Sequence, residues 1–353
     1  MTSKERVLRA VVREPQDRTP VDFAATDDTI RLLEGHFGVT GYDAVLTSLG
    51  IDLRTVKPPY VGPRRAERAD GSFQDVFGAW RRRVPAGGAS YDEVVESPLA
   101  GVTSVSEIRA FPMPRVEWFD FTDIPRQCER YTDYAVLSGG TRNDLDIRGY
   151  STFQMPTYLR PMEQLFRDLY LAPDLAHALF QRFADFSLAF YERLFQAARG
   201  GIDIFVVLDD YGGQHGPLIR REAWRDFVRP YLAPGIALAK SHGLAVMLHS
   251  CGSVRALIAE FLELGVDILD PIQVQAAGME PKALAEEFGD RLTFHGSIDI
   301  QRTLPFGTPA DVRAEVAQRK ATLGRRHGLI LGPCHNIQPD TPLANILALY
   351  DLA

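Results

Sequence analysis

The stretch Leu244-Ala-Val-Met-Leu-His249-Ser-Cys251-Gly252 decides how the rest of this chain is interpreted. Its five leading apolar residues predict a buried strand that ends in an imidazole and a thiol. Because side chains along a strand repeat their direction at every second residue, His249 and Cys251 should point the same way. A second apolar run, Gly328-Leu-Ile-Leu-Gly-Pro-Cys334, also ends in a thiol. The two strand ends therefore offer three soft metal ligands: His249, Cys251 and Cys334.

Three protein ligands around an open fourth position are the layout of a catalytic zinc site, whereas structural zinc sites are closed by four ligands. A simpler interpretation stays open, because a cysteine at the end of an apolar strand is often only a small buried hydrophobic residue. The third cysteine, Cys128, lies far from both motifs in the sequence and is expected to be an ordinary thiol.

The composition is that of an ordinary globular protein, with 353 residues, 45% of them hydrophobic and 24% charged. The net charge of −7 and the absence of a basic stripe in the sequence argue against nucleic acid as a partner. The first residues are charged and lack the apolar core of a signal peptide. No run reaches the about 18 apolar residues of a membrane span. Three cysteines suggest no disulfide framework, so a cytoplasmic location is expected.

Apolar runs alternate with helical patterns along most of the chain. The expected strands are 18–25, 52–56, 135–139, 202–208, 244–252, 266–271, 292–299 and 328–332. Continuous apolar runs favour a parallel sheet covered on both faces, and eight of them predict a (β/α)8 TIM-type barrel. Ser3 is the expected N-cap of the first helix, and Thr308 that of a late one. We expect one barrel domain over residues 1–353, with 58–134 as an inserted β-rich excursion after the second strand.

In such a barrel the active site forms at the carboxyl ends of the strands. Polar residues gather at these positions, and we predict roles for them by type. The predicted catalytic residues are Asp209, Asp210, Tyr211 and His335, and the predicted substrate-binding residues are Gln214, Asp270 and Gln273. Structural alternatives stay open, since Asp209 and Asp210 could cap the next turn and His335 could be an ordinary rim histidine.

Several motifs resemble the uroporphyrinogen decarboxylase superfamily. They are His-Ser-Cys-Gly at 249–252, Gly-Ser-Ile-Asp at 296–299 with Leu-Pro-Phe-Gly-Thr-Pro at 304–309, and Gly-Pro-Cys-His-Asn-Ile-Gln-Pro-Asp-Thr-Pro at 332–342. The resemblance covers most of the chain, is strongest over 202–353, and implies a (β/α)8 barrel with a deep cleft. True decarboxylases of this superfamily follow an Arg-Thr-Pro-Val start with an arginine-rich segment that grips carboxylates. Here Arg18-Thr-Pro-Val is followed by the acidic segment Asp22–Asp28, which argues against porphyrinogen decarboxylation.

The corrinoid-linked methyltransferase branch of the superfamily has a His-x-Cys motif and a distant cysteine as zinc ligands. His249, Cys251 and Cys334 match this motif position by position. The resemblance implies that zinc binds the sulfur of an acceptor thiol, that a partner protein carries the corrinoid, and that the chain forms a homodimer. A thiol on zinc is deprotonated, and the thiolate is the nucleophile that attacks the methyl group.

The sequence therefore predicts a zinc-dependent methyltransferase. It would move a methyl group between a corrinoid of the cobalamin type and a small substrate, either a thiol or a methylated or methoxylated compound. One alternative is a metal-free decarboxylase or lyase that acts on a small carboxylic acid. Another is a non-catalytic protein in which zinc only links two strands of the barrel.

Overall fold

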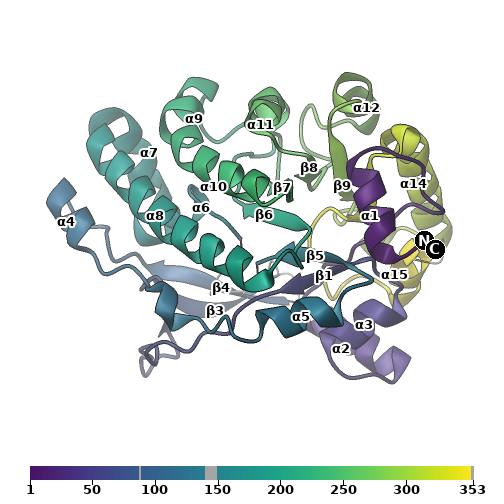
Figure 1. The fold of residues 1–353 in the computed structure, drawn as a ribbon, viewed down its shortest axis with the longest axis horizontal. Coiled ribbons are helices and arrows are strands. Elements are labelled where there is room, and N and C mark those ends of the chain that lie inside the picture. The colour runs from purple at the N-terminus through teal and green to yellow at the C-terminus, as the bar shows by residue number, and fades with distance from the viewer. Residues whose placement is uncertain (87–88, 140–148, 351–353) are drawn as a thin grey trace.

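The computed structural model describes residues 1–86, 89–139 and 149–350. Seven parallel strands form one curled sheet in which neighbours in space are also successive parallel strands along the chain (Figure 1). Their bounds are β1 Leu53–Val56, β5 Ala135–Ser138, β6 Ile204–Leu208, β7 Ala245–His249, β8 Ile268–Asp270, β9 Thr293–Ile298 and β10 Leu329–Pro333. Helices cover the outside of this sheet, and the predicted TIM-type barrel is confirmed.

The prediction of a regular first strand over 18–25 is wrong. This segment forms only isolated parallel bridges, from Val21 to Leu331 and from Ala25 to Ile337. It still connects the two edges of the sheet, because the backbone N–H of Asp52, just before β1, donates to Val21 O (3.0 Å). A regular ladder is interrupted because the Asp52 carboxylate accepts the N–H of Val21 (2.8 Å). The segment therefore closes the barrel in place of an eighth strand.

Side chains along β6 alternate between two buried environments. Ile204, Val206 and Leu208 pack inside the barrel, whereas Phe205 and Val207 pack against the outer helices. This explains the continuous apolar run in the sequence, since both faces of a parallel sheet are covered.

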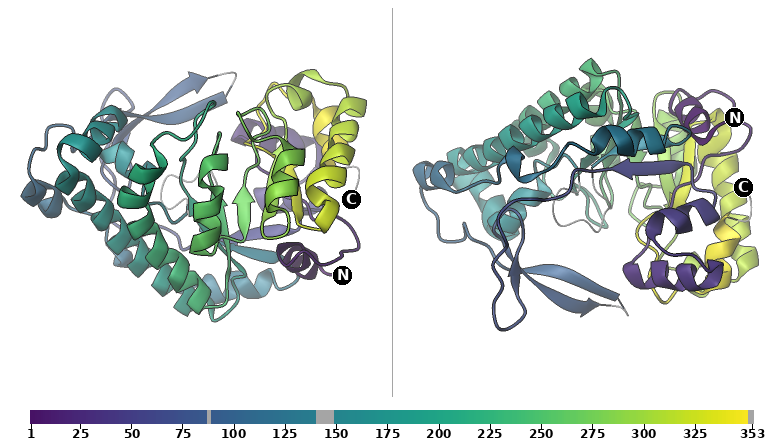
Figure 2. Two further views of the ribbon diagram at one scale, coloured as in Figure 1. Left: turned by 90° about the horizontal axis from the view of Figure 1, so that it is seen from above. Right: turned by 60° about the horizontal axis from the view of Figure 1, so that its bottom comes forward.

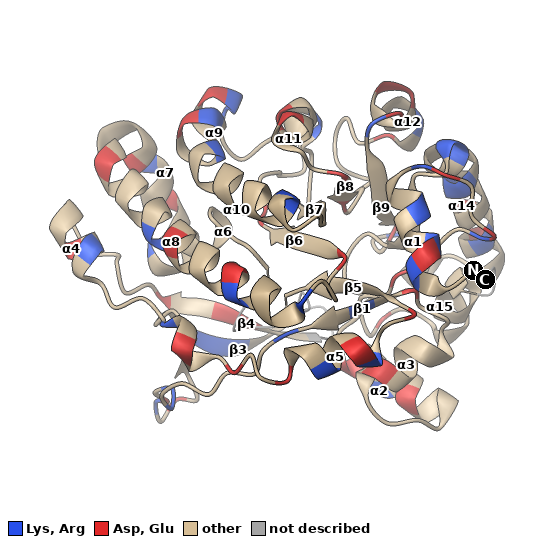
Figure 3. Ribbon diagram, in the orientation of Figure 1, with Lys and Arg blue, Asp and Glu red and all other residues tan. Residues whose placement is uncertain are grey.

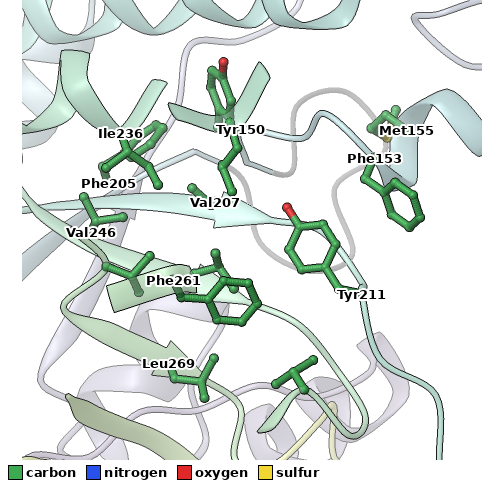
Figure 4. Packing of buried hydrophobic residues seen from close by; sticks show 14 of the residues in the cluster. Tyr150, Phe153, Met155, Phe205, Val207, Tyr211, Ile236, Val246, Phe261 and Leu269 are labelled. Carbon is green, nitrogen blue, oxygen red and sulfur yellow. The ribbon is translucent and has the colours of Figure 1, made fainter. Parts of the chain in front are cut away.

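The outer helices pack on this sheet through a layer rich in aromatic side chains. Figure 4 shows Tyr150, Phe205, Tyr211 and Phe261 in this layer, all of them almost fully buried. The helices of the barrel are α1 Ser3–Val11, α2 Asp27–Phe37, α3 Tyr42–Ser48, α5 Ile124–Arg130, α6 Gln154–Leu159, α7 Met162–Leu171, α8 Pro173–Ala198, α9 Arg221–Phe227, α10 Arg229–Ser241, α11 Ile258–Leu264, α12 Pro281–Phe288, α13 Thr303–Phe306, α14 Pro309–Thr322 and α15 Leu343–Tyr350.

The first helix closes the amino-terminal end of the barrel, because Val7, Ala10 and Val11 pack in the interior cluster. Its N-cap is Thr2 rather than the predicted Ser3. The Thr2 hydroxyl accepts the N–H of Glu5 and the Glu5 carboxylate accepts that of Thr2, which makes a capping box.

The excursion over 58–134 combines a small sheet with short helices. β2 (Phe73–Gln74), β3 (Trp80–Ala86) and β4 (Ala89–Glu96) form a three-stranded antiparallel sheet, followed by α4 (Val105–Ala110) and then by the barrel helix α5, which lies in the same segment of the chain. The β3–β4 hairpin projects from the barrel (Figure 2). The hydroxyl of Tyr91 in β4 donates to Gln338 Oε1 (2.9 Å), which joins the hairpin to the segment after β10.

Charged residues of both signs are scattered over the outer helices (Figure 3). Among the described residues, no helix is both long and apolar enough to cross a membrane.

A buried carboxylate links three of these helices. Glu260 of α11 accepts hydrogen bonds from Arg221 of α9 (2.7 Å), Arg225 of α9 (2.8 Å) and Arg229 of α10 (2.7 Å). The hydrogen bonds from Arg225 and Arg221 hold the pKa of Glu260 at about 2, although burial opposes ionisation.

Replacing Glu260 by Gln is expected to lower the free energy of unfolding at pH 7 by about 2–3 kcal/mol, because charge-assisted hydrogen bonds are lost. Because the pKa of Glu260 is lowered on folding, its ionised carboxylate stabilises the fold at pH values above the ordinary pKa near 4.5. This contribution is lost as the pH falls toward 2. The difference between wild type and variant in denaturant unfolding should therefore shrink over that range. Glu263→Gln is the matched control, since Glu263 is half exposed and pairs with Arg229 at the surface. An equal loss in both variants would contradict a special role for Glu260.

Candidate metal centre

The strand register brings His249 and Cys251 to the mouth of the barrel. Met247 of β7 packs inside the barrel, so His249 and Cys251, two and four residues later, continue on the inner side. The distance from His249 Nε2 to Cys251 Sγ is 3.6 Å. The predicted common direction of these two side chains is therefore what the structure shows.

Asp210 completes a group of three possible metal donors. Leu208 of β6 pairs with His249 of β7, so Asp210 lies beside Cys251 just beyond the paired strands. Its Oδ1 atom accepts the backbone N–H of Cys251 (2.8 Å) and lies 3.8 Å from His249 Nε2. One donor atom from each of Asp210, His249 and Cys251 lies within 4.8 Å of the other two.

This geometry fits zinc. A tetrahedral zinc ion with one nitrogen and one sulfur ligand separates those atoms by about 3.6 Å, which is the distance between His249 Nε2 and Cys251 Sγ. His249 Nδ1 is hydrogen-bonded to Asp270 Oδ2 (2.6 Å), which leaves Nε2 for a metal. Burial alone would lower the pKa of His249, but the charges of Asp270 and Cys251 raise it to about 10. A metal would therefore displace a proton from this ring.

Two glycines hold the loop that carries Cys251. A Cβ atom on Gly212 would lie 2.6 Å from Cys251 O, and one on Gly252 would lie 2.6 Å from the backbone of Gly212. Gly252 also has φ +83°, a conformation that other residues rarely adopt. The loops after β6 and β7 thus cross in direct contact, which fixes Asp210 and Cys251 next to each other.

The predicted third ligand, Cys334, does not belong to this group of donors among the described residues. Cys334 follows β10 directly, is 3% exposed, and its backbone N–H donates to Ile298 O (2.9 Å). Its role as a ligand stays a prediction. Cys128 is buried under α8, and burial raises the pKa of its thiol, in line with an ordinary buried cysteine.

A metal-facing cavity of about 270 Å³ opens over these donors. Its wall includes Asp210, His249, Cys251 and the predicted catalytic residue His335. The hairpin contributes Arg83, Ser90, Tyr91 and Asp92, so the excursion takes part in the site. An inner chamber of about 390 Å³ lies beside it inside the barrel, and Asp27, Leu208 and Asn336 belong to both walls.

Asp209 and Tyr211, both predicted to be catalytic, are fully buried and lie outside the walls of these two spaces as described. The Asp209 carboxylate accepts hydrogen bonds from Ser151 Oγ (2.6 Å), Gln154 N (2.7 Å) and Tyr211 OH (2.9 Å). Burial raises the pKa of Asp209 even though these hydrogen bonds favour the ionised form. Their catalytic roles stay predictions.

The three predicted substrate-binding residues lie in different surroundings. Gln214 is exposed and outside both spaces, Gln273 Oε1 accepts the N–H of Gly252 (2.7 Å), and Asp270 faces the inner chamber. Gln273 thus supports the loop of Cys251. Substrate binding by these residues is not tested by the geometry and stays a prediction.

Sequence reasoning missed Asp210 as a metal donor and the hairpin as part of the wall. Asp210 offered one signal, its position two residues after β6, which matches that of Cys251 after β7, but the register that brings the two together comes from the structure. The hairpin offered no such signal, since its contact with Gln338 joins residues 247 positions apart in the chain.

Comparison with known proteins places this site in a family. The uroporphyrinogen decarboxylase (URO-D) family model matches residues 150–353. "Methylcobamide:CoM methyltransferase MtbA" of Methanosarcina mazei is 23% identical over 100% of this chain and 97% of its own length. "Uroporphyrinogen decarboxylase" of Chlorobaculum tepidum is 22% identical over 62% of this chain, and the match spans 54% of that protein. A solved structure, "methyltransferase from Methanosarcina mazei", has a TM-score of 0.67 at 18% identity and covers 100% of this chain and 98% of its own.

The fold, the position of the donor group at the barrel mouth and the segment that the family model matches are all consistent with one family. The chain belongs to the uroporphyrinogen decarboxylase family, and the full-length match to the methylcobamide:CoM methyltransferase confirms its predicted resemblance to the methyltransferase branch of that superfamily.

Proposed function

We propose that this enzyme is a zinc-dependent methyltransferase that moves a methyl group between a small substrate and a corrinoid. The observation that carries the proposal is the donor group at the barrel mouth, where His249 Nε2 and Cys251 Sγ lie 3.6 Å apart and face a cavity. His249 and Cys251 would hold the zinc together with Asp210 or Cys334. Zinc, when bound, supplies a Lewis acid that favours the thiolate form of an acceptor or assists departure of a heteroatom.

The residues around the donors suit a small substrate with a hydrogen-bond donor. Asp92 Oδ1 is buried in the cavity wall and has no hydrogen-bond partner among the described residues. A substrate N–H or O–H group would supply that partner after rotation of the Asp92 side chain, since Oδ1 is not exposed as it stands. His335, on the same wall, would hold or move a proton at the substrate heteroatom. The hairpin covers this side of the cavity and would exclude water from the reacting atoms.

The size of the cavity bears on the corrinoid. A space of about 270 Å³ is at the lower limit of small-molecule sites. A corrinoid macrocycle would therefore approach from the barrel mouth, as it would when carried by a partner protein. A corrinoid docked there would supply the methyl group, and the residues of the cavity wall would hold the substrate heteroatom that accepts it.

A decarboxylase or lyase that acts on a small carboxylic acid is the second candidate, because several relatives are named uroporphyrinogen decarboxylase. The carboxylate of Asp27, which lies on the walls of both spaces, argues against this alternative, since it would repel an anionic substrate.

The decisive experiment measures zinc in the purified enzyme and methyl transfer from methylcobalamin to a panel of small thiols. We expect about one zinc per chain and a spectral change of the corrinoid that a strong chelator abolishes. A protein without zinc, or decarboxylation of a small acid that chelators leave unchanged, would favour the second candidate.

A further inference from the structure

Four side chains, three of them buried, form a continuous hydrogen-bonded chain behind the donor group. His249 Nδ1 bonds to Asp270 Oδ2 (2.6 Å), and His295 Nδ1 bonds to the other oxygen, Asp270 Oδ1 (2.6 Å). His295 Nε2 then bonds to Asp22 Oδ2 (3.0 Å). His249, Asp270 and His295 are each less than 5% exposed. Water therefore has little access to replace these contacts.

The barrel itself aligns this chain. His249 of β7 pairs in register with Asp270 of β8, and Leu269 of β8 pairs with Phe294 of β9, which puts Asp270 beside His295. Asp22 lies in the closing segment, where its backbone N–H donates to Leu331 O of β10 (2.8 Å). The four side chains therefore lie on rigid backbone at one level of the barrel wall.

The chemistry of the chain determines which atoms carry hydrogen. Both nitrogens of His295 face carboxylate oxygens, which only accept hydrogen bonds, so His295 carries two N–H groups and a positive charge. The cation lies between Asp22 and Asp270 and compensates their charges. Asp270 in turn accepts from His249 Nδ1, which fixes the ring orientation and directs Nε2 toward Cys251.

We propose that Asp270, His295 and Asp22 are positioning residues that hold His249 for the metal. This inference rests on the metal site of the proposed function and adds three residues that act through His249. It favours a supporting role for Asp270 over the substrate-binding role predicted from sequence, because both carboxylate oxygens are occupied by imidazoles.

The test is the zinc affinity of the variants Asp270→Asn, His295→Gln and Asp22→Asn, measured by competition with a chromophoric chelator at one pH. Asp270→Asn is expected to weaken zinc binding about 10- to 100-fold, the usual effect of losing a carboxylate behind a ligating histidine. His295→Gln should weaken it about 3- to 10-fold and Asp22→Asn less, because each acts one bond further from the metal. The cobalt(II)-substituted Asp270→Asn protein should also show shifted visible bands, since the imidazole ligand is reoriented.

Asp168→Asn is the matched control. Asp168 is a buried carboxylate of α7 that is paired with Arg160 and lies outside both spaces at the barrel mouth. This variant should lower the melting temperature but leave zinc affinity and the cobalt spectrum unchanged. Wild-type zinc affinity in both Asp270→Asn and His295→Gln would overturn the inference and leave the proposed function intact. Equal losses in the Asp168 control would also overturn it, as a general effect of destabilisation. A wild-type protein that binds no zinc would overturn both proposals.

Discussion

Cys251→Ala is expected to lower zinc affinity by more than about 100-fold and to abolish methyl transfer. The removal of a residue behind a ligand already weakens metal sites 10- to 100-fold, and the loss of a ligand should exceed that. The Cys251 sulfur lies 3.6 Å from His249 Nε2, and the crossing of the loops at Gly212 and Gly252 leaves the backbone little freedom to supply another donor. The measurement is zinc content after dialysis, with methyl transfer from methylcobalamin on the same samples.

Cys128→Ala is the control for this experiment. The Cys128 thiol is buried and packs against Gly201, away from the barrel mouth. Its loss should destabilise the fold by about 1 kcal/mol through a small cavity, with zinc content unchanged. Full zinc occupancy in Cys251→Ala would show that the metal centre is not where we propose it.

Cys334→Ala and Asp210→Asn identify the third ligand. If zinc recruits Cys334 as the sequence predicts, Cys334→Ala should lose zinc about as strongly as Cys251→Ala does. If Asp210 remains the ligand, as its contact with Cys251 suggests, Asp210→Asn should show the larger loss. The two variants therefore show whether the third zinc ligand is Cys334, as the sequence motif predicts, or Asp210, as the donor group in the structure suggests.

The strands and the pair His249–Cys251 could be predicted because both depend on local patterns. A continuous apolar run predicts a buried parallel strand, and the period of two fixes the relative direction of side chains along it. Both predictions hold for β6 and β7, where alternate residues pack on opposite faces of the sheet.

The partners of these residues depend on register between strands, which the pattern of one strand does not contain. Asp210 joins the donor group only because β6 and β7 pair Leu208 with His249. The contacts of Asp270 with His249 and His295 likewise require three neighbouring strands in register. The segment 18–25 departs from the predicted strand for a related reason, since the side chain of Asp52 replaces a backbone ladder bond there.

Asp209→Asn is expected to lower the free energy of unfolding by about 3 kcal/mol, the largest effect on stability that we predict. The carboxylate accepts from the Ser151 and Tyr211 hydroxyls and from the backbone N–H groups of Thr152 (3.0 Å) and Gln154 (2.7 Å). An amide of the same shape keeps one acceptor oxygen but turns an NH2 group toward donors. At least two buried N–H or O–H groups would then lose their partner, and each such loss costs about 1–3 kcal/mol.

The position of these donors explains why a carboxylate is needed there. The backbone N–H groups belong to the segment that leads into α6, where unpaired amides attract negative charge. Asp209 thereby ties the loop before α6 to the end of β6 and holds Gln154, whose side chain donates to Asp210 Oδ2 (2.7 Å). We therefore expect Asp209 to act on the donor group through the fold rather than through contact with the substrate.

Asp210→Asn separates this explanation from the catalytic role predicted for Asp209. The Asp210 side chain is about one-third exposed, and its oxygens accept from Gln154 and Cys251. The free energy of unfolding of metal-free Asp210→Asn, measured with denaturant, should therefore change by less than about 1 kcal/mol. Metal-free Asp209→Asn should unfold at clearly lower denaturant concentration. An Asp209→Asn protein with wild-type stability and no methyl transfer would instead mean that this carboxylate acts in the reaction. In that case the wall of the metal-facing cavity must open far enough to expose Asp209, which is fully buried here.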